Sequence, residues 1–161
     1  MRPRIEFLKD ESATEQLGAA LWRVMRPGLT LYLHGDLGTG KTFLTRAILR
    51  ASGYDGRVKS PTYTLLEPYS VSLHGRTVGL FHFDLYRMGE PREFIEAGFR
   101  EYFGSDNICI VEWPEQAGDL IPAADIDIFL TAEGEGRTVE LRASSALGTT
   151  CLENLDPSPN P

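Results

Sequence analysis

Residues 35–42 read Gly-Asp-Leu-Gly-Thr-Gly-Lys-Thr and match the phosphate-binding loop pattern G-x-x-x-x-G-K-[ST] at every fixed position. The motif requires a strand before it and a helix after it. Residues 29–33 form a short apolar run before the loop, and residues 42–51 place apolar side chains on one helical face after it. The three segments together predict an α/β domain that binds a nucleotide.

The residue types in the loop suit phosphate binding. Glycines at 35, 38 and 40 allow backbone conformations that other residues resist, so the backbone N–H groups can point inward. With the N-terminus of the following helix, these groups form a nest for phosphate anions. Lys41 is expected to reach the β- and γ-phosphates, and the Thr42 hydroxyl is expected to ligate Mg²⁺. The nucleotide-binding candidates in the loop are Gly35, Asp36, Leu37, Gly38, Thr39, Gly40, Lys41 and Thr42.

Two carboxylates follow apolar, strand-like runs elsewhere in the chain. Glu112 directly follows residues 108–111, and Asp84 follows residues 79–83. Parallel sheets bind ligands at the carboxyl ends of their strands, and phosphoryl transfer uses a carboxylate there with Mg²⁺. One acid could serve the metal and the other the attacking water, although each could instead be a solvated carboxylate at a strand end. The catalytic candidates are Lys41, Asp84 and Glu112, and the metal candidates are Thr42 and Glu112.

Three further segments each leave two interpretations open. Residues 60–64 supply hydroxyl groups after a basic turn and could form a switch-like segment that senses the γ-phosphate, or an edge strand entered through a proline. His82 could pair with Asp84 along its strand or be a packed core histidine. Trp113 and Pro114 fit a core anchor and strand stop better than a catalytic element. No Asn-Lys-x-Asp motif occurs, so ATP is favoured over GTP.

Size and charge restrict the class of protein. The chain has 161 residues, 42% of them hydrophobic and 24% charged, which suits one globular domain. It lacks a membrane-length apolar stretch and a signal-peptide core, so we expect a cytoplasmic protein that does not associate with membranes. The net charge is −7, so any nucleic acid would be held mainly by a partner. Cys109 in an apolar run and Cys151 in a polar tail indicate neither a disulfide framework nor a metal cluster.

Hydrophobic periodicity and turn signals place the remaining elements. An edge strand is expected at residues 5–9, and a capping box at residues 12–15 opens a helix with Leu17, Leu21 and Val24 inward. A further helix is expected from Pro91. The expected strands are residues 62–71 and 78–86 around a His74-Gly75 turn, a buried strand at 108–111, and a hairpin of residues 125–131 and 137–143.

These elements predict a phosphate-loop NTPase-like, three-layer α/β fold with a mixed, mainly parallel central sheet and β-hairpins. Residues 1–143 form the ATPase domain in this prediction. From Ser144 onward, Ser, Thr and Pro dominate and the periodicity is lost. Residues 144–161 are therefore expected to be a disordered C-terminal tail.

Four segments together resemble the bacterial TsaE family, also called YjeE. They are the phosphate-binding loop, Val58-Lys-Ser-Pro-Thr-Tyr-Thr-Leu65, His82-Phe-Asp-Leu-Tyr-Arg87 and Val111-Glu-Trp-Pro-Glu115, in order and with suitable spacing. The similarity covers residues 14–142. The chain departs from the family at Thr39, where alanine is common, in a slightly longer turn at His74-Gly75, and in its proline-rich end.

The resemblance implies an activity and roles for particular residues. The family is the ATPase subunit of the bacterial machinery that makes threonylcarbamoyladenosine in tRNA. By this resemblance, ATP lies on the loop, Thr42 and Glu112 hold Mg²⁺, and Asp84 is needed for hydrolysis. It also implies that Thr14, Glu115 and Arg137 lie near the nucleotide.

The resemblance further implies TsaB and TsaD as partners. TsaD transfers the threonylcarbamoyl group from its adenylate to the adenosine beside the anticodon, and the ATPase resets the complex between turnovers. The tRNA would be contacted mainly through these partners. Two other classes stay open: a small-molecule kinase, for which no arginine-rich substrate lid is apparent, and a nucleotide-gated binding module that does not hydrolyse ATP.

Overall fold

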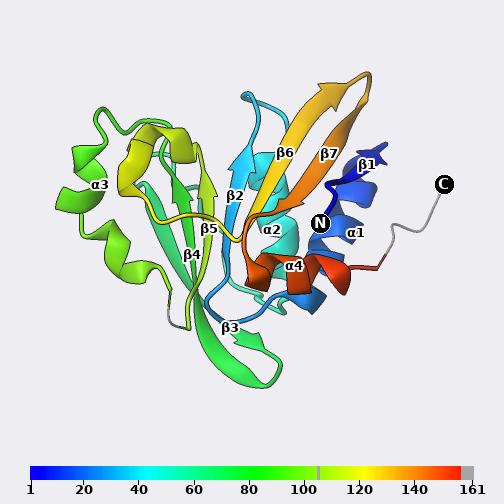
Figure 1. Cartoon of the computed structure of the whole chain (residues 1–161), viewed down its shortest axis with the longest axis horizontal. Coiled ribbons are helices and arrows are strands. Elements are labelled where there is room, and N and C mark those ends of the chain that lie inside the picture. Colours follow the sequence, from blue (N-terminus) through cyan, green and yellow to red (C-terminus); the bar gives the residue numbers. More distant parts are fainter. Residues whose placement is uncertain (105, 157–161) are drawn as a thin grey trace.

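The computed structural model describes residues 1–104 and 106–156, which form a seven-stranded sheet flanked by helices (Figure 1). The strands are β1 Arg4–Leu8, β2 Thr30–His34, β3 Leu66–Leu73, β4 Arg76–Asp84, β5 Ile108–Glu112, β6 Ile126–Glu133 and β7 Gly136–Ala143. The helices are α1 Glu11–Val24, α2 Lys41–Ala51, α3 Arg92–Glu96 and α4 Ala146–Glu153, with 3-10 helices η1 Phe99–Tyr102 and η2 Pro114–Leu120.

The sheet is parallel in its centre and antiparallel at both edges. Its strand order is β1-β7-β6-β2-β5-β4-β3. Strands β6, β2, β5 and β4 run parallel, whereas β1, β7 and β3 each pair antiparallel with their neighbours. The carboxyl ends of β2, β4 and β5 therefore meet at one end of the sheet, at the top of Figure 1. This arrangement confirms the predicted fold class, with β1 as the expected edge strand.

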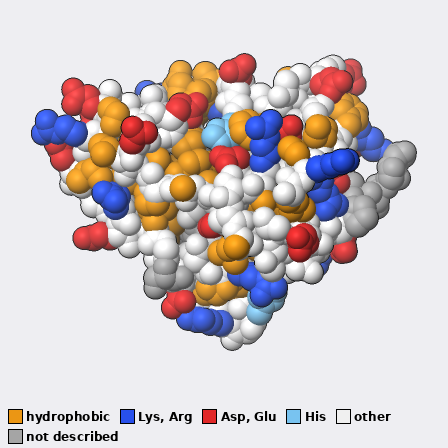
Figure 2. Space-filling model, viewed as in Figure 1, with side chains coloured by type: hydrophobic (Ala, Val, Ile, Leu, Met, Phe, Trp, Pro, Cys, Tyr) orange, Lys and Arg blue, Asp and Glu red, His pale blue; other side chains and the backbone are white. Residues whose placement is uncertain are grey.

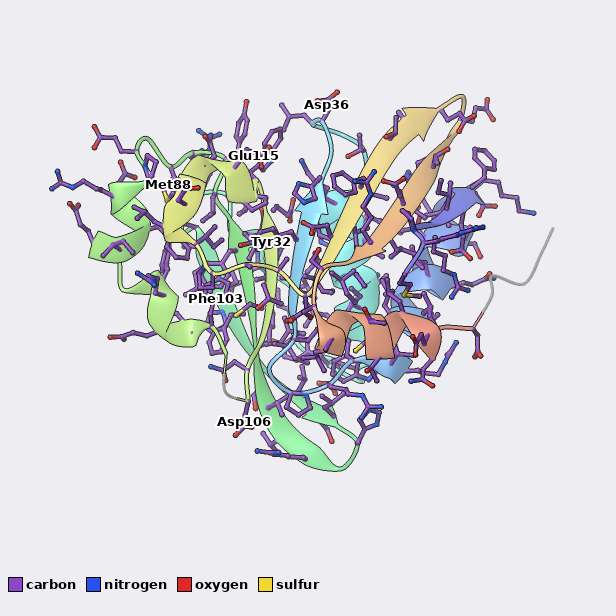
Figure 3. All side chains as sticks on the ribbon, viewed as in Figure 1. Tyr32, Asp36, Met88, Phe103, Asp106 and Glu115 are labelled. Atoms are coloured by element: carbon purple, nitrogen blue, oxygen red, sulfur yellow. The ribbon has the colours of Figure 1, made fainter. Side chains whose placement is uncertain are left out.

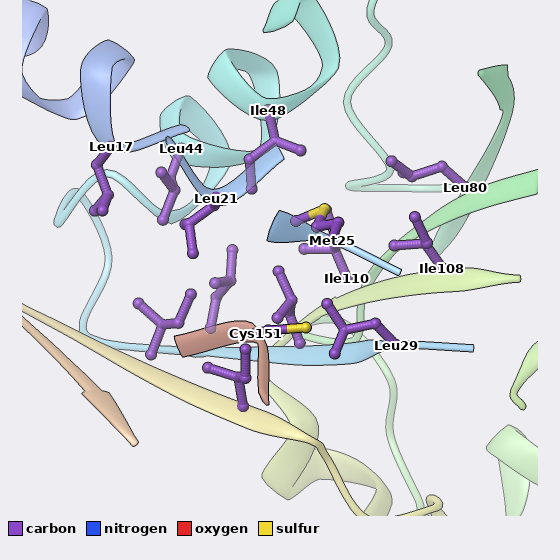
Figure 4. Close-up of a cluster of buried hydrophobic side chains, with 14 of the residues drawn as sticks. Leu17, Leu21, Met25, Leu29, Leu44, Ile48, Leu80, Ile108, Ile110 and Cys151 are labelled. Carbon is purple, nitrogen blue, oxygen red and sulfur yellow. The ribbon is translucent and has the colours of Figure 1, made fainter. Parts of the chain in front are cut away.

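Helices α1 and α2 cover one face of the sheet and form the larger hydrophobic core with it (Figure 4). Leu17 and Leu21 of α1 are buried as predicted, together with Ile48 of α2. The two helices approach closely because Gly18 has no side chain: a Cβ there would lie 2.6 Å from the Cβ of Ala47. This packing holds the helix that follows the phosphate-binding loop against the sheet.

A second, aromatic core covers the opposite face of β4 and β5. The Phe83 ring centroid lies 5.3 Å from that of Phe99 and 5.2 Å from that of Phe103. Cys109 and Val111 point into this core, while the alternating residues of β5 point into the larger one. Strand β5 is buried on both faces, as its continuous apolar run predicted. Packing from both sides fixes the positions of the strand ends that carry the candidate acids.

Helix α1 begins earlier than the sequence predicted. Asp10 is its N-cap, and the Asp10 carboxylate accepts a hydrogen bond from the Ala13 backbone N–H at 2.9 Å. The predicted capping box at residues 12–15 is therefore wrong, since Ser12 lies inside the helix. Val24, which was expected to point inward, packs against the larger core but is only half-buried at the helix end.

Two other elements are shorter than predicted. The helix expected from Pro91 divides into α3 and η1, because Gly98 between them adopts a left-handed conformation with φ 75°. Strand β3 begins at Leu66 rather than at residue 62. The preceding residues form a turn in which the Leu65 N–H donates to the Pro61 carbonyl at 2.8 Å. The edge-strand interpretation of residues 60–64 is therefore wrong.

The segment after β7 packs on the domain, so the prediction of a disordered tail is wrong over α4. The Ser145 hydroxyl caps α4 and donates to Asp125 Oδ1 at 2.7 Å. The Arg4 guanidinium donates to the Leu155 carbonyl at 2.6 Å. The buried side chains of this segment are Cys151, Leu152 and Leu155. The end of the predicted tail, residues 157–161, lies outside the described residues.

Both cysteines are free and buried. Burial raises the pKa of the Cys109 thiol to about 12 and also raises that of Cys151, which the sequence placed in a polar tail. In the part of the chain that the structure describes, no helix combines the length and the apolar character needed to cross a membrane.

Candidate functional site

Three central strands bring their carboxyl ends together beside the phosphate-binding loop. Glu112 ends β5 and lies opposite Asp84, the last residue of β4, in the parallel register. Strand β2, which pairs with β5, ends at the residue before the loop. Figure 3 shows Asp36 of the loop and Glu115 of η2 at this end of the sheet, and Asp106 at the other. The loop and both acids selected from the sequence therefore share one site.

The loop backbone depends on its glycines. Gly35, Gly38 and Gly40 have φ angles of 150°, 81° and 101°, in the region that favours glycine. A side chain at Gly40 would also collide with the guanidinium of Arg137. Arg137, the second residue of β7, donates from Nη1 to the Thr39 carbonyl at 3.1 Å. Arg137 therefore lies against the loop at the N-terminus of α2.

Lys41 is held inside the loop. Its side chain is 5% exposed, and its ammonium group donates to the Gly35 carbonyl. The ammonium nitrogen also lies 3.6 Å from the centroid of the Trp113 ring. Burial lowers the pKa of Lys41, whereas the nearby carboxylates of Glu112 and Glu115 raise it. The lysine is thus a desolvated cation at the point where the motif predicts phosphate.

Glu112 has hydrogen-bond partners on both sides. The Thr42 hydroxyl donates to its two carboxylate oxygens at 3.0 and 3.1 Å. His82 Nε2 lies 2.5 Å from Oε2, so His82 is a buried histidine whose partner is Glu112 rather than Asp84. A hydroxyl and a carboxylate at this spacing are the hard oxygen ligands that Mg²⁺ prefers, completed in most sites by phosphates and water. The donor set therefore fits Mg²⁺.

Asp84 is a half-buried carboxylate at the mouth of the site. Its Oδ1 accepts a hydrogen bond from the Tyr86 N–H at 3.1 Å. Burial raises the pKa of Asp84, and the charge of Glu112 adds to this, against opposing contributions from the Tyr86 N–H, His82 and Lys41. A carboxylate with a raised pKa is a stronger proton acceptor than an ordinary one.

A cavity of about 610 Å³ opens over these groups. The predicted site residues that line it are Leu37, Gly38, Gly40, Lys41, Thr42, Asp84, Glu112 and Arg137. The predicted residues that do not line it are Thr14, Gly35, Asp36, Thr39 and Glu115. Thr14 is fully buried on α1, and among the described residues its hydroxyl has no hydrogen-bond partner.

The cavity is also lined by residues for which the sequence predicted no role in the site. They are Glu11, Phe43, Tyr86, Arg87 and Trp113. Trp113 packs against the aromatic core, as expected for a core anchor, and its ring also covers Lys41; its φ is 58°. The Arg87 guanidinium lies 4.8 Å from the Tyr63 ring, and Thr62 reaches the cavity from the same turn. The position of Arg87 just after a strand end was the signal that could have identified it.

The parallel strand ends, the glycine-rich loop and the buried lysine define an α/β protein of the phosphate-loop class, whose fold binds nucleotides. Residues 8–139 match the family described as "Threonylcarbamoyl adenosine biosynthesis protein TsaE". The chain belongs to the TsaE family, a family of tRNA threonylcarbamoyladenosine biosynthesis proteins.

Individual relatives support this assignment over most of the chain. The tRNA threonylcarbamoyladenosine biosynthesis protein TsaE of Haemophilus influenzae is 38% identical over 157 residues, covering 94% of this chain and 97% of the relative. The protein of the same name from Bacillus subtilis is 34% identical over 110 residues, covering 68% and 66%. The crystal structure of YdiB from Bacillus subtilis superposes with a TM-score of 0.78 at 24% identity, covering 96% of this chain and 94% of that one, and shows the same fold.

Proposed function

We propose that this chain is a Mg²⁺-dependent ATPase that binds ATP on the phosphate-binding loop and serves threonylcarbamoyladenosine formation in tRNA. The single observation that carries the proposal is the meeting of Lys41, Thr42, Glu112 and Asp84 at one cavity. A glycine-rich loop alone could bind an anion, but a buried lysine, a hydroxyl–carboxylate pair and a second acid together suit phosphoryl transfer.

Each group has a role in hydrolysis. The loop N–H groups and Lys41 bind the phosphates, and Thr42 and Glu112 hold Mg²⁺. When bound, the metal neutralises charge on the β- and γ-phosphates. Asp84 orients the attacking water and accepts its proton as water attacks the γ-phosphorus and the bond to ADP breaks. The raised pKa of Asp84 supports this role because it makes the carboxylate a better base.

The family supports a role in tRNA modification, and the surface charge supports a role in which partner proteins hold the tRNA. The relatives are named for threonylcarbamoyladenosine biosynthesis in tRNA. The net charge of −7 argues against a large tRNA-binding surface on this chain. On the face in Figure 2, Lys and Arg side chains are scattered among acidic and apolar ones rather than joined into a basic surface. We therefore assign most of the tRNA contact to TsaB and TsaD, with this chain resetting their complex between turnovers.

The resetting role is tested by counting modified tRNA per TsaB–TsaD complex. Without this chain, the count should stop near one per complex, and with it the count should rise to many. The Lys41→Ala variant should fail to support further turnovers, because it lacks the phosphate-binding cation. The partners should also stimulate ATP hydrolysis by this chain severalfold. Equal yields with and without the chain would refute the role.

A further inference from the structure

A buried histidine contacts the site from inside the sheet. His82 of β4 is 1% exposed, and its Nε2 lies 2.5 Å from Glu112 Oε2. Its other ring nitrogen, Nδ1, is also buried and has no hydrogen-bond partner in residues 1–104 and 106–156. A buried polar atom without a partner is unfavourable, so a phenylalanine would serve packing alone better than this histidine. The polarity of His82 therefore serves its contact with Glu112.

Thr42 and His82, the two hydrogen-bond partners of Glu112, contact its carboxylate oxygens differently. The Thr42 hydroxyl is almost equidistant from both carboxylate oxygens, at 3.0 and 3.1 Å, so it does not distinguish them. His82 contacts Oε2. A hydroxyl that donates its hydrogen keeps lone pairs for a cation, whereas the imidazole N–H has no metal-binding capacity while it donates. His82 thus holds one carboxylate oxygen and leaves the other for the metal.

We propose that His82 is a positioning residue that orients Glu112 and thereby sets the affinity of the site for Mg²⁺. The inference rests on the proposed function, because it concerns the metal of the proposed ATP site. Hydrogen-bond partners of metal-ligating carboxylates commonly act in this way, by fixing the orientation of the ligand. The contact joins adjacent strands β4 and β5: His82 lies opposite Ile110, two residues before Glu112 on the same face of β5, so the sheet itself fixes the spacing of the two groups.

The test is a Mg²⁺ titration of the full chain at a fixed ATP concentration, with ATP binding followed by calorimetry. His82→Phe keeps a ring of similar size but removes the donor, so the Mg²⁺ midpoint should rise about tenfold or more. ATP binding in EDTA should change by less than about twofold, since no phosphate contact is lost. His82→Gln retains an amide N–H that can reach Oε2 and should restore the midpoint to within about threefold of the original protein.

Two comparisons separate this role from a general effect on folding. In a Glu112→Gln background, His82→Phe should shift the midpoint by less than about twofold, because the residue acts through Glu112. If His82→Phe does not fold, His82→Gln and His82→Asn replace it, since both carry an amide but the shorter side chain falls short of Oε2.

The outcomes are decisive for this proposal. It is overturned by an unshifted midpoint in His82→Phe, by an additive effect in the Glu112→Gln background, or by equal midpoints for the Gln and Asn variants. If one of these results is obtained while the unsubstituted chain binds Mg²⁺–ATP, the role of His82 is refuted but the proposed function is not. If the unsubstituted chain fails to bind Mg²⁺–ATP at all, both fall.

Discussion

Lys41 and Glu112 are charged side chains that are almost fully buried, which is uncommon unless each has partners. Lys41 donates to a loop carbonyl, and Glu112 accepts from Thr42 and His82. These contacts offset the desolvation of both charges and keep them where a phosphate and a metal would bind. The two acids at the strand ends differ, because Glu112 is enclosed whereas Asp84 is only half-buried.

Because of this difference, substitutions of the two acids should have different effects. Glu112→Gln should raise the Mg²⁺ concentration needed for half-maximal ATP hydrolysis, because a proposed metal ligand is lost. Asp84→Asn should leave ATP binding and Mg²⁺ dependence intact but lower kcat roughly 10²-fold or more, because the water loses its base. Steady-state hydrolysis measured against Mg²⁺ concentration distinguishes the two.

Asp106→Asn is the matched control. Asp106 is an exposed acid at the opposite end of the sheet (Figure 3), where it pairs with Arg76 at 2.8 Å. Its removal should leave both the Mg²⁺ dependence and kcat near those of the unsubstituted chain. The ligand role of Glu112 is refuted if Glu112→Gln and the unsubstituted chain show the same Mg²⁺ dependence.

Among the secondary-structure elements, α4 is part of the hydrophobic core. Its cap joins it to the start of β6, and Arg4 of β1 holds the residues that follow it. Its buried side chains join the larger core with α1 and α2. The chain that continues past β7 therefore closes one end of the domain rather than leaving it.

Ending the chain after Ser144 should lower the melting temperature by about 10 °C or more. The reason is that three buried side chains, each contributing about 1.5–3 kcal/mol, are removed and their neighbours are exposed. Thermal unfolding of the truncated and full chains measures the effect. A chain ending after Asp156 is the control, because it keeps all of α4. A truncated chain that melts like the full one would show that α4 adds nothing to stability.

Asp127 of β6 contacts β2 and the residue that follows β7, and these contacts make the stability of the fold depend on pH. Its Oδ1 lies 2.7 Å from His34 Nε2 of β2, and its Oδ2 accepts from the Ser144 hydroxyl at 2.7 Å. The hydrogen bond from His34 lowers the pKa of Asp127 most; burial raises it, and Ser144 lowers it further. Because the folded pKa is the lower one, ionised Asp127 stabilises the fold above about pH 4, and this is lost as pH falls through the folded pKa.

Asp127→Asn should therefore cost about 1 kcal/mol at pH 7, or a few degrees of melting temperature. The difference from the unsubstituted chain should shrink below about pH 4, where the carboxylate becomes protonated in both states. Melting temperatures from pH 7 to pH 3 provide the measurement. A difference that stays constant over this range would contradict the assignment.

The phosphate-binding loop and the buried strand β5 were predicted correctly from local patterns, whereas the capping box of α1 and the features that depend on distant contacts were not. The strand–loop–helix around Lys41 and the apolar strand that ends at Glu112 follow from neighbouring residues alone. Helix α4 is only eight residues long, and its burial depends on contacts with Arg4 and Asp125, which are distant in the sequence. The partner of His82 depends on β4 lying beside β5, whereas alternation along β4 points to Asp84.

Across the whole molecule, the sheet brings the polar groups of the candidate site together at one end and packs apolar side chains on both faces. The cavity over the strand ends is open enough for a nucleotide, and residues 60–64 reach it through Thr62. The acidic chain brings together the residues that the proposed ATP hydrolysis requires, but it has no evident surface for holding a large polyanion on the face in Figure 2. This combination fits the proposed role, in which ATP hydrolysis acts on partner proteins rather than on tRNA directly.

In the proposed function, Mg²⁺–ATP binds at the strand ends through the phosphate-binding loop. Calorimetric titration of ATP in excess MgCl₂ into the unsubstituted chain, Lys41→Ala and Lys9→Ala tests it, with Lys9 as an exposed lysine outside the site. We expect Lys9→Ala to bind like the unsubstituted chain, GTP to compete weakly, and Lys41→Ala to bind roughly 10- to 100-fold more weakly while remaining folded. Unchanged ATP affinity in a folded Lys41→Ala protein would contradict the claim.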